Sequence, residues 1–495
     1  MRQIQFLLRI AKALWQSGLL RVSPQEFVRI LRAWWLCGPT FAFLGAMGAI
    51  RFPHRVAIHD EEGALTFQDL DQRVEGWASS LLRDHHVGPG SQVAIVCRNH
   101  RSFVIHLLAL TRIGADVLPL GTDLPDHVRD TILERQEISL VLGESDINFD
   151  NPQVLGRYRA GQLITLTSGS TGISKGIRRR PTLTQLLPAV TGLIESLPFQ
   201  LHRPFVLAIP LNHGYGVATL ALSLALGAPL YMATRYEIGP LVNRAEDDEP
   251  PLVVTVPTLL LRWLRDGFEK GTPKLAAIVT GSAPLSESLS MGLLEAFGPV
   301  LFNLYGSSEA GLISLATPAA LQAAPGTVGM PLPGNEFLIR DSSGRGLAQG
   351  QTGSIWVRGP LVLQAGSDGW RDTGDLGYLD FAGRLFVCGR GDSMIVSGGE
   401  NVYPHEVEAI LASHPSVDQV AIVVVADQEF SQRMLAAVVL KDDQSLKSES
   451  LRAWLRKRVE RFKLPRSIQI LREIPRNRLG KVDRKALTSV LQSSD

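Results

Sequence analysis

The feature that most constrains the fold of this chain is a regular alternation of short β-rich runs with helical patterns. From residue 51 to about residue 142, runs such as RVAIHD and SQVAIVCR alternate with helical segments such as FQDLDQRVEGWASSLLRD. This succession predicts a layered α/β fold. The same alternation returns between FVLAIP and LAAIVTG, so we expect one large domain to continue past residue 300.

The last third of the chain changes its pattern twice. Short strands and Gly-rich turns between Gly329 and Val387 predict a small β subdomain. Beyond about Arg390, the order helix, strand, strand, helix, strand predicts a compact α+β domain. A chain of 495 residues also exceeds what one hydrophobic core usually supports. We therefore predict an N-terminal extension over 1–40, a large domain over 41–390 and a C-terminal domain over 391–495.

The composition narrows the range of partners. The chain has 50 basic and 48 acidic residues, a balance that disfavours a nucleic-acid-binding protein. Its three cysteines are widely separated, so they form neither a disulfide framework nor a zinc-ligand spacing. These features predict a cytoplasmic protein.

The N-terminal segment is basic and amphipathic. It contains two apolar runs, FLLRIAKALW and FVRILRAWWL, and the residues within and beside them include six Arg and Lys against the single acid Glu26. Pro39 and three glycines interrupt the uncharged stretch 33–50, which disfavours a membrane-spanning helix. Two interpretations stay open: peripheral association with the inner membrane surface, or a helical pair packed on the large domain.

The strongest local motif is LITLTSGSTGISKG, residues 163–176, in which an apolar strand runs into a loop rich in Thr, Ser and Gly. Such a loop can cradle phosphate with its N–H groups and hydroxyls, and Lys175 adds a positive charge. It is not a Walker loop, because Ser174 precedes the lysine and Gly176 follows it. A plain surface loop is the alternative. The candidate phosphate-binding residues are Thr167, Ser168, Gly169, Ser170, Thr171, Gly172 and Lys175.

Further segments occur in a fixed order after this loop: PLNHGYG, TGSAPL, LYGSSEAG, DGWRDTGDLGYLD, GRGDSMIVSGGENVYPHEVE and IPRNRLGKVDRKAL. Together with the loop, they make the chain resemble the adenylate-forming superfamily from about Phe41 to Leu487. That group contains acyl-CoA synthetases, non-ribosomal adenylation domains and luciferases. The resemblance implies a large N-terminal domain that carries most of the site and a mobile α+β lid at the C-terminus.

The resemblance also implies cofactors and the residues that hold them. ATP would bind with its β- and γ-phosphates on the loop Thr167 to Lys175, and Glu309 would hold Mg²⁺, a hard cation suited to carboxylate ligands. Tyr305 would stack on adenine, and Asp375 would accept the ribose hydroxyls. The full set expected around the nucleotide adds Gly281, Ser282, Ala283, Pro284, Gly306, Ser307, Ser308 and Arg390.

The resemblance assigns the two chemical steps to the C-terminal part. Lys481 in RLGKVDR would stabilise the charge that builds when a carboxylate attacks the α-phosphate. Without the resemblance, a lysine among basic neighbours would indicate solvated charge. Asp392 falls at the hinge position of the family, and Gly398 and Gly399 would line the path of the pantetheine arm of coenzyme A. Lys463 receives no role.

The segment PLNHGYGVATLALSLALGAPL predicts one wall of the acyl pocket, with His213 as its gate; a core or surface histidine is the alternative. No aspartate lies between Pro210 and Pro229 to pair with a substrate ammonium, which disfavours amino acids. The wall is aliphatic, and the pattern is most similar to bacterial fatty acyl-CoA synthetases. We therefore predict that a fatty acid is converted to acyl-AMP and then to acyl-CoA.

Several alternatives stay open. An aryl acid is the second choice of substrate, and a carrier-protein thiol or a free amine could capture the same acyl-adenylate. Residues 306–310, GSSEA, nearly form the nucleophile elbow of a serine hydrolase, although Ala310 stands where that motif has its second glycine. A lipid-binding protein without catalysis is the last alternative, and retention of Lys175, Glu309 and Lys481 argues against it.

Overall fold

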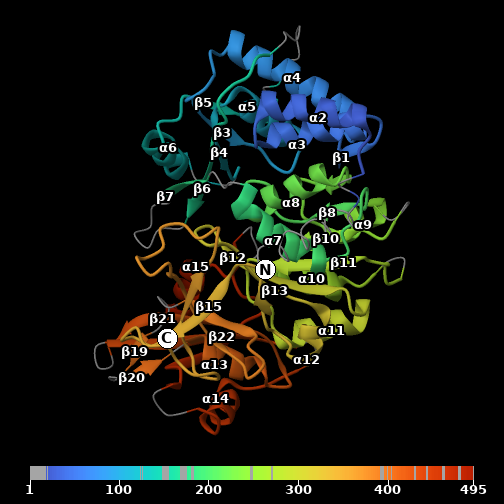
Figure 1. The fold of residues 1–495 in the computed structure, drawn as a ribbon. Coiled ribbons are helices and arrows are strands. Elements are labelled where there is room, and N and C mark those ends of the chain that lie inside the picture. Colours follow the sequence, from blue (N-terminus) through green and yellow to red (C-terminus); the bar gives the residue numbers. More distant parts are fainter. Residues whose placement is uncertain are drawn as a thin grey trace. The chain divides into compact units, whose positions relative to one another are not determined.

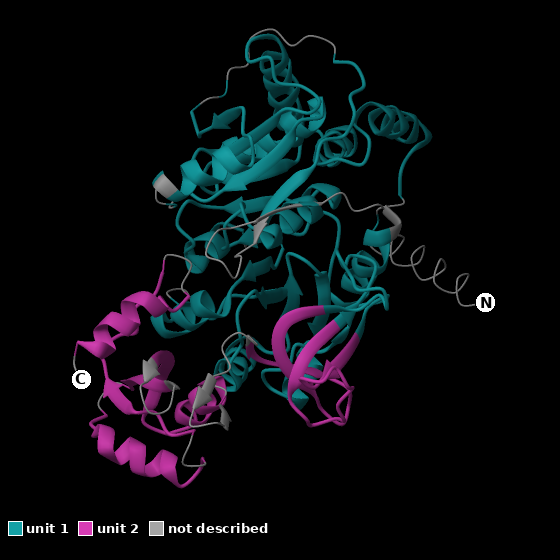
Figure 2. Cartoon of the chain, turned by 90° about the vertical axis from the view of Figure 1, so that its left-hand side faces the viewer, with its two compact units in different colours: residues 1–336, 357–371 teal, residues 337–356, 372–495 magenta. Residues whose placement is uncertain are grey.

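A computed structural model describes most of the chain, and the chain divides into two compact units. The first unit comprises Met1–Glu336 with Val357–Arg371, and the second comprises Phe337–Trp356 with Asp372–Asp495 (Figure 2). The described residues are 18, 21–122, 124, 126–145, 147, 155–167, 175–179, 183–245, 249–268, 271–390, 395–397, 400–402, 404–427, 431–441, 444–459, 463–477 and 481–493.

Two helices open the described part of the first unit, α2 (Pro24–Cys37) and α3 (Phe41–Arg51). Helix α2 starts with a capping box between Ser23 and Glu26, and it ends at Gly38, whose φ is +63°. Thr40 then caps α3. The uncharged stretch is therefore divided between two helices, and within the described ranges no helix has the length and apolarity to cross a membrane.

The first unit contains a five-stranded sheet in the order β5-β3-β4-β6-β7 (Figure 1). Its first four strands are parallel, whereas β7 runs antiparallel to β6. Every residue of helix α5 is buried, which fits a helix enclosed by the fold. The strands are β3 (Gln92–Val96), β4 (Asp116–Leu120), β5 (Leu140–Leu142), β6 (Leu163–Thr167) and β7 (Lys175–Arg179). The helices are α4 (Phe67–Arg83), α5 (Arg101–Ile113) and α6 (Asp126–Arg135).

A nine-stranded sheet in the order β14-β13-β12-β11-β10-β8-β9-β1-β2 forms the rest of this unit. The strands from β12 to β1 in this order are parallel. All residues of β10 and β11 are buried, as expected for parallel strands covered on both faces. The strands are β1 (Val56–Asp60), β2 (Gly63–Thr66), β8 (Phe205–Leu207), β9 (Leu230–Met232), β10 (Leu252–Thr255), β11 (Ala277–Gly281), β12 (Leu301–Ser307), β13 (Gly311–Ala316) and β14 (Met330–Pro331). The helices are α7 (Leu183–Ser196), α8 (Gly214–Ala225), α9 (Ile238–Ala245), α10 (Pro257–Asp266), α11 (Glu287–Phe297) and α12 (Pro318–Ala323).

A four-stranded sheet, β15-β16-β17-β18, forms the predicted β subdomain. Its strands are β15 (Glu336–Arg340), β16 (Gly353–Arg358), β17 (Arg371–Leu379) and β18 (Leu385–Arg390). Most of this sheet belongs to the second compact unit. The predicted domain boundary near Arg390 stays a prediction.

The C-terminal residues form a sheet in the order β20-β19-β22-β21, with β23 beside β22. Its strands are β19 (Ile395–Ser397), β20 (Glu400–Val402), β21 (Val417–Asp427), β22 (Ser431–Leu440) and β23 (Ser467–Ile470). The helices are α13 (Pro404–Ala412), α14 (Ser448–Arg456) and α15 (Arg484–Gln492). The predicted order of helix, strand, strand, helix, strand is present from α13 to β23, but the prediction missed β19 and β20 before it and α15 after it. The predicted α/β fold class is confirmed as well.

Candidate active site

The predicted phosphate loop connects the two strands of a hairpin. Thr167 ends β6 and Lys175 begins β7, and the two residues are register partners in the antiparallel pair. The sheet therefore fixes both ends of the loop. The sequence predicted the strand before the loop, but not the strand that begins at Lys175. Ser168, Gly169, Ser170, Thr171 and Gly172 lie outside the described residues, as do the side chains of Thr167 and Lys175.

Three of the predicted motifs follow parallel strands of the nine-stranded sheet at their carboxyl ends. PLNHGYG follows β8, TGSAPL includes the end of β11, and LYGSSEAG includes the end of β12. Strands β11 and β12 are neighbours, with Gly281 paired to Leu304. The carboxyl ends of parallel strands are where ligands bind in open α/β sheets. The structure therefore brings TGSAPL beside LYGSSEAG.

The end of β11 has an unusual backbone. A Cβ atom on Gly281 would lie 2.6 Å from the carbonyl oxygen of Leu304, so only glycine fits there. Ser282 has a φ of +62°, a left-handed conformation that is uncommon for residues other than glycine and that is concentrated at functional sites. Ala283 is half-buried and Pro284 is exposed.

The end of β12 carries the candidate adenine and magnesium residues. Tyr305 is 9% exposed, and the pairing with β13 shifts register between Tyr305 and Gly306. A Cβ atom on Gly306 would lie 2.5 Å from the carbonyl oxygen of Gly311. Glu309 is half-buried, and its carbonyl oxygen accepts a hydrogen bond from the Leu363 N–H at 2.9 Å. A partly exposed carboxylate in an anchored turn fits a cation that also binds phosphate and water.

This turn argues against the serine hydrolase alternative. A nucleophile elbow joins a strand to a helix, whereas β12 leads into the antiparallel strand β13. The Ser307 Oγ accepts a hydrogen bond from the Ala310 N–H at 3.0 Å, which gives this hydroxyl a role in the turn. Ser308 is exposed at the tip.

His213 lies at the N-cap of α8, where its side chain is exposed and makes no capping hydrogen bond to the helix. The approach to this helix is held by Asn99, a buried residue that sequence reasoning missed. The Asn99 side chain donates to the carbonyl oxygen of Ile209 at 2.7 Å and accepts from the Leu211 N–H at 2.8 Å. Because its partners lie about a hundred positions away in sequence, no local signal could have revealed it.

Tyr215 is a second residue that the predictions omitted, although it lies within PLNHGYG. Its hydroxyl donates to the carbonyl oxygen of Val279 at 3.0 Å and so ties the first turn of α8 to β11. Burial raises the pKa of Tyr215, which keeps this hydroxyl protonated. Val217 and Leu220, from the predicted acyl wall, are buried in the large core of the first unit.

The two residues predicted to bind the ribose, Asp375 and Arg390, lie opposite each other on neighbouring strands of the second unit. Asp375 in β17 is the register partner of Arg390 in β18. The Asp375 N–H donates to the Thr373 hydroxyl at 3.1 Å, and that hydroxyl donates to the carbonyl oxygen of Ile355 at 2.9 Å. The side chain of Arg390 lies outside the described residues. A half-buried carboxylate on a fixed strand can accept hydrogen bonds from two hydroxyls of a sugar.

The side chain of Lys481 is exposed. The Lys481 N–H donates to the Asn477 side chain at 3.0 Å, and the Asn477 N–H donates to the Lys481 carbonyl at 2.8 Å. Lys463, which received no role, forms an ion pair with Glu406 at 3.2 Å. Asp392, Gly398 and Gly399 lie outside the described residues.

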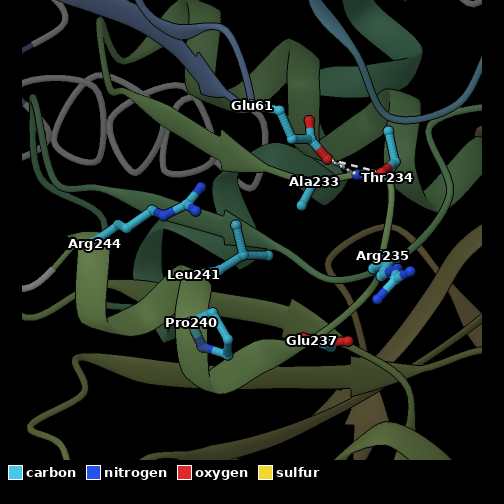
Figure 3. Close-up of a pocket in the computed structure, with 8 residues that line it drawn as sticks. All are labelled: Glu61, Ala233, Thr234, Arg235, Glu237, Pro240, Leu241 and Arg244. Atoms are coloured by element: carbon cyan, nitrogen blue, oxygen red, sulfur yellow. Dashed lines mark hydrogen bonds between the residues drawn. The ribbon is translucent and has the colours of Figure 1, made fainter.

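A pocket that the sequence did not predict lies at the ends of β1 and β9, with a volume of about 280 Å³ (Figure 3). The Glu61 carboxylate accepts hydrogen bonds from the Thr234 N–H at 2.6 Å and from its hydroxyl at 2.8 Å. The lining contains two arginines and two glutamates, so its formal charges balance. The lining residues are Glu61, Ala233, Thr234, Arg235, Glu237, Pro240, Leu241 and Arg244.

Comparison with known families gives two matches. The description "AMP-binding enzyme" matches residues 47–160 and 159–365, and "AMP-binding enzyme C-terminal domain" matches residues 406–481. Among curated proteins, 2-succinylbenzoate–CoA ligase from Geobacillus kaustophilus is 28% identical, covering 90% of this chain and 96% of that protein. Oxalate–CoA ligase from Arabidopsis thaliana is 29% identical, covering 88% and 96% of the two chains.

Solved structures of two proteins resemble the chain over nearly its full length. One is o-succinylbenzoate coenzyme A synthetase from Bacillus subtilis in complex with ATP and a magnesium ion, with a TM-score of 0.77, 26% identity and coverage of 90% and 99% of the two chains. The other is the amide bond synthetase McbA from Marinactinospora thermotolerans, with a TM-score of 0.77, 26% identity and coverage of 92% and 99%.

Proposed function

Because this chain belongs to the AMP-binding enzyme family, we propose that it is an acid–CoA ligase that works through an acyl-adenylate. The observation that carries the proposal is the similarity to a 2-succinylbenzoate–CoA ligase across 90% of this chain. ATP and Mg²⁺ are the cofactors of the first step, and coenzyme A is the second substrate. A structure of a relative contains both ATP and magnesium.

In the first step, a carboxylate oxygen of the acid attacks the α-phosphorus of ATP, and pyrophosphate leaves. In the second step, the thiol of coenzyme A attacks the acyl carbon, loses its proton, and AMP leaves. We assign Lys481 to stabilising the negative charge of the first transition state. Glu309 would hold the metal ion that supplies charge neutralisation on the phosphates, and Asp375 would orient the ribose.

For the acid, we propose a fatty acid, with an aryl acid as the second choice. The support is the aliphatic character of the α8 segment and the lack of an aspartate in the sequence 210–229. The relatives named above are ligases of acids that carry additional polar groups, 2-succinylbenzoate and oxalate. The second carboxylate of a dicarboxylic acid would need a cation beside it in the acyl pocket. The segment 210–229 contains neither Lys nor Arg.

The experiment is a panel of carboxylic acids assayed for ATP-dependent pyrophosphate release, with and without coenzyme A. The panel contains short, medium and long fatty acids, benzoates, oxalate, malonate and 2-succinylbenzoate. We expect release with fatty acids and a product with the mass of acyl-CoA when coenzyme A is present. Preference for a dicarboxylic acid would overturn the substrate proposal and leave the ligase proposal standing.

A second candidate is an ATP-dependent amide synthetase, which the similarity to McbA supports. Both activities share the acyl-adenylate and differ only in the group that attacks it. An amide product from simple amines, together with no product from coenzyme A, would establish this candidate in place of the CoA ligase.

The remaining assignments stay proposals of the same kind. We propose the boundary near Arg390, the roles of Thr167 to Lys175 and of His213, and peripheral membrane association through the N-terminal segment.

A further inference from the structure

Helix α2 presents a continuous apolar stripe to solvent. Phe27, Val28, Leu31 and Trp35 are 52%, 65%, 51% and 57% exposed. Leu31 follows Phe27 by four residues and Val28 by three, and Trp35 follows Leu31 by four, so all four lie on one side of the helix. We call this set the outer face of α2. Single exposed apolar residues are ordinary, but a stripe of four large ones along one helix marks an interaction surface.

The opposite side of α2 already has its partner within the chain. Ala33 and Cys37 are buried on that side, and Trp34, at the edge of the outer face, packs edge-to-face on Phe43 of α3, with ring centroids 5.0 Å apart. Helix α2 is thus anchored on α3, which lies beside it (Figure 1). The outer face is left over after this packing, so it is not the side that attaches the helix to the fold.

Charge around the outer face is positive. Arg32 of α2 is exposed one turn after Val28, and Arg21 is exposed just before the helix. The guanidinium of Arg157, another exposed residue, lies over the Trp35 ring at 5.6 Å. The acid of the helix, Glu26, is engaged at the N-terminus, where it accepts a hydrogen bond from the Ser23 N–H at 2.7 Å. An apolar stripe bordered by arginines matches a lipid surface with anionic headgroups.

We infer that the outer face of α2 binds an anionic lipid surface, with the helix axis lying along the membrane plane. A helix of 14 residues is about 21 Å long, too short to span a bilayer but suited to lie in its interface. Tryptophan is enriched at this depth because its ring is apolar and its N–H reaches water and headgroups. The inference rests on the peripheral association proposed above and deepens it, because it names the surface that docks and the charge of the lipid.

The test is co-sedimentation of the full-length protein with vesicles of phosphatidylcholine alone or mixed with phosphatidylglycerol. We expect binding to the mixed vesicles and weaker binding as salt is added. Phe27→Ser/Trp35→Ser should weaken binding roughly tenfold or more, because two large apolar groups no longer insert. Arg32→Gln should weaken binding to the mixed vesicles by roughly fivefold, and leave binding to phosphatidylcholine alone unchanged.

The matched control is Phe381→Ser, which removes an aromatic side chain that is 88% exposed elsewhere in the chain. It should bind vesicles like the wild type, and thermal unfolding should confirm that all variants fold. Unchanged binding by Phe27→Ser/Trp35→Ser overturns the inference. Binding that appears only after removal of residues 1–20 also overturns it, because that segment would then cover the outer face of α2 in the full-length protein. A lipid-free dimer that the same variant dissociates would assign the face to a second copy.

Discussion

Lys481 has a hydrogen-bonded backbone and an exposed side chain, and two of its basic neighbours, Arg476 and Arg484, have structural partners. The Arg476 side chain donates to the Gln419 side chain at 3.0 Å, and the Arg484 side chain donates to the carbonyl oxygen of Ile422 at 3.1 Å. These two arginines therefore hold the segments before and after Lys481 to the sheet. The backbone that carries the Lys481 ammonium is therefore held to the sheet of its own unit, which helps to position the charge.

We predict that Lys481→Ala lowers the rate of acyl-adenylate formation by about a hundredfold to a thousandfold. Thioester formation from supplied acyl-AMP and coenzyme A should be largely spared, because the charge on the α-phosphate builds only in the first step. The two rates are measured separately, as pyrophosphate release and as acyl-CoA by mass. Lys485→Ala, an exposed lysine nearby, should change neither rate. Normal adenylation by Lys481→Ala would remove Lys481 from the mechanism.

A second prediction at this scale concerns Asp71 on α4. Burial, together with the nearby carboxylate of Glu75, raises the pKa of Asp71 to about 6, while Arg112 and Arg29 act in the opposite direction. The folded state therefore keeps a proton that the unfolded chain releases near its ordinary pKa of 3.8. Folding stability should therefore fall as pH rises between 3.8 and about 6, and this group should change it little above that range.

Asp71→Asn mimics the protonated carboxyl and should reduce this loss. We expect the variant to be more stable than the wild type at neutral pH, by about 1 kcal/mol, and to differ little at about pH 4. The measurement is the midpoint of thermal unfolding at both pH values. The control is Asp266→Asn, which changes an exposed carboxyl and should have the same small effect on stability at both pH values. A gain in stability for Asp71→Asn at acid pH alone would contradict the raised pKa that is assigned to Asp71.

At the scale of elements, the sequence predicted the strands and helices well because their burial follows their composition. Strands β10 and β11 are continuous apolar runs, and they are buried on both faces. The order of strands in the sheets could not be read from the sequence, since it depends on contacts between distant segments. For the same reason, the sequence revealed neither the hydrogen bonds of Asn99 nor the pairing of Thr167 with Lys175.

Gly306 tests the close backbone packing at the end of β12. In Gly306→Ala, the new methyl group would lie 2.5 Å from the carbonyl oxygen of Gly311, so the β12–β13 turn must move. We expect a loss of about 1–3 kcal/mol in stability and a marked fall in adenylation, because Tyr305 and Glu309 are carried by this turn.

Gly156→Ala is the matched control, since a Cβ atom there meets no other atom within 4 Å. It should leave both stability and pyrophosphate release unchanged. If Gly306→Ala behaved like this control, the turn would be more tolerant than its geometry indicates, and its role in placing Glu309 would be in doubt.

At the scale of the whole molecule, the predicted nucleotide residues are divided between the two compact units. The loop from Thr167 and the turn at Tyr305 belong to the first unit, whereas Asp375 and Lys481 belong to the second. The order of the motifs along the chain predicted this set of residues. Their arrangement in a complete site depends on long-range placement of the two units, which motif order does not encode.

The last prediction concerns the hinge that the resemblance places at Asp392. This residue lies between β18, which ends at Arg390, and β19, which begins at Ile395. If rotation there exchanges Lys481 for the Gly398–Gly399 segment at the active site, then a residue that fixes φ should block the second step more than the first. Asp392→Pro should therefore retain measurable pyrophosphate release while acyl-CoA formation from supplied acyl-AMP falls sharply. Asp392→Ala, which leaves φ free, should keep both activities. Equal loss of both steps in a folded Asp392→Pro variant, or equal loss in Asp392→Ala, would show that the two half-reactions do not depend on rotation at this residue.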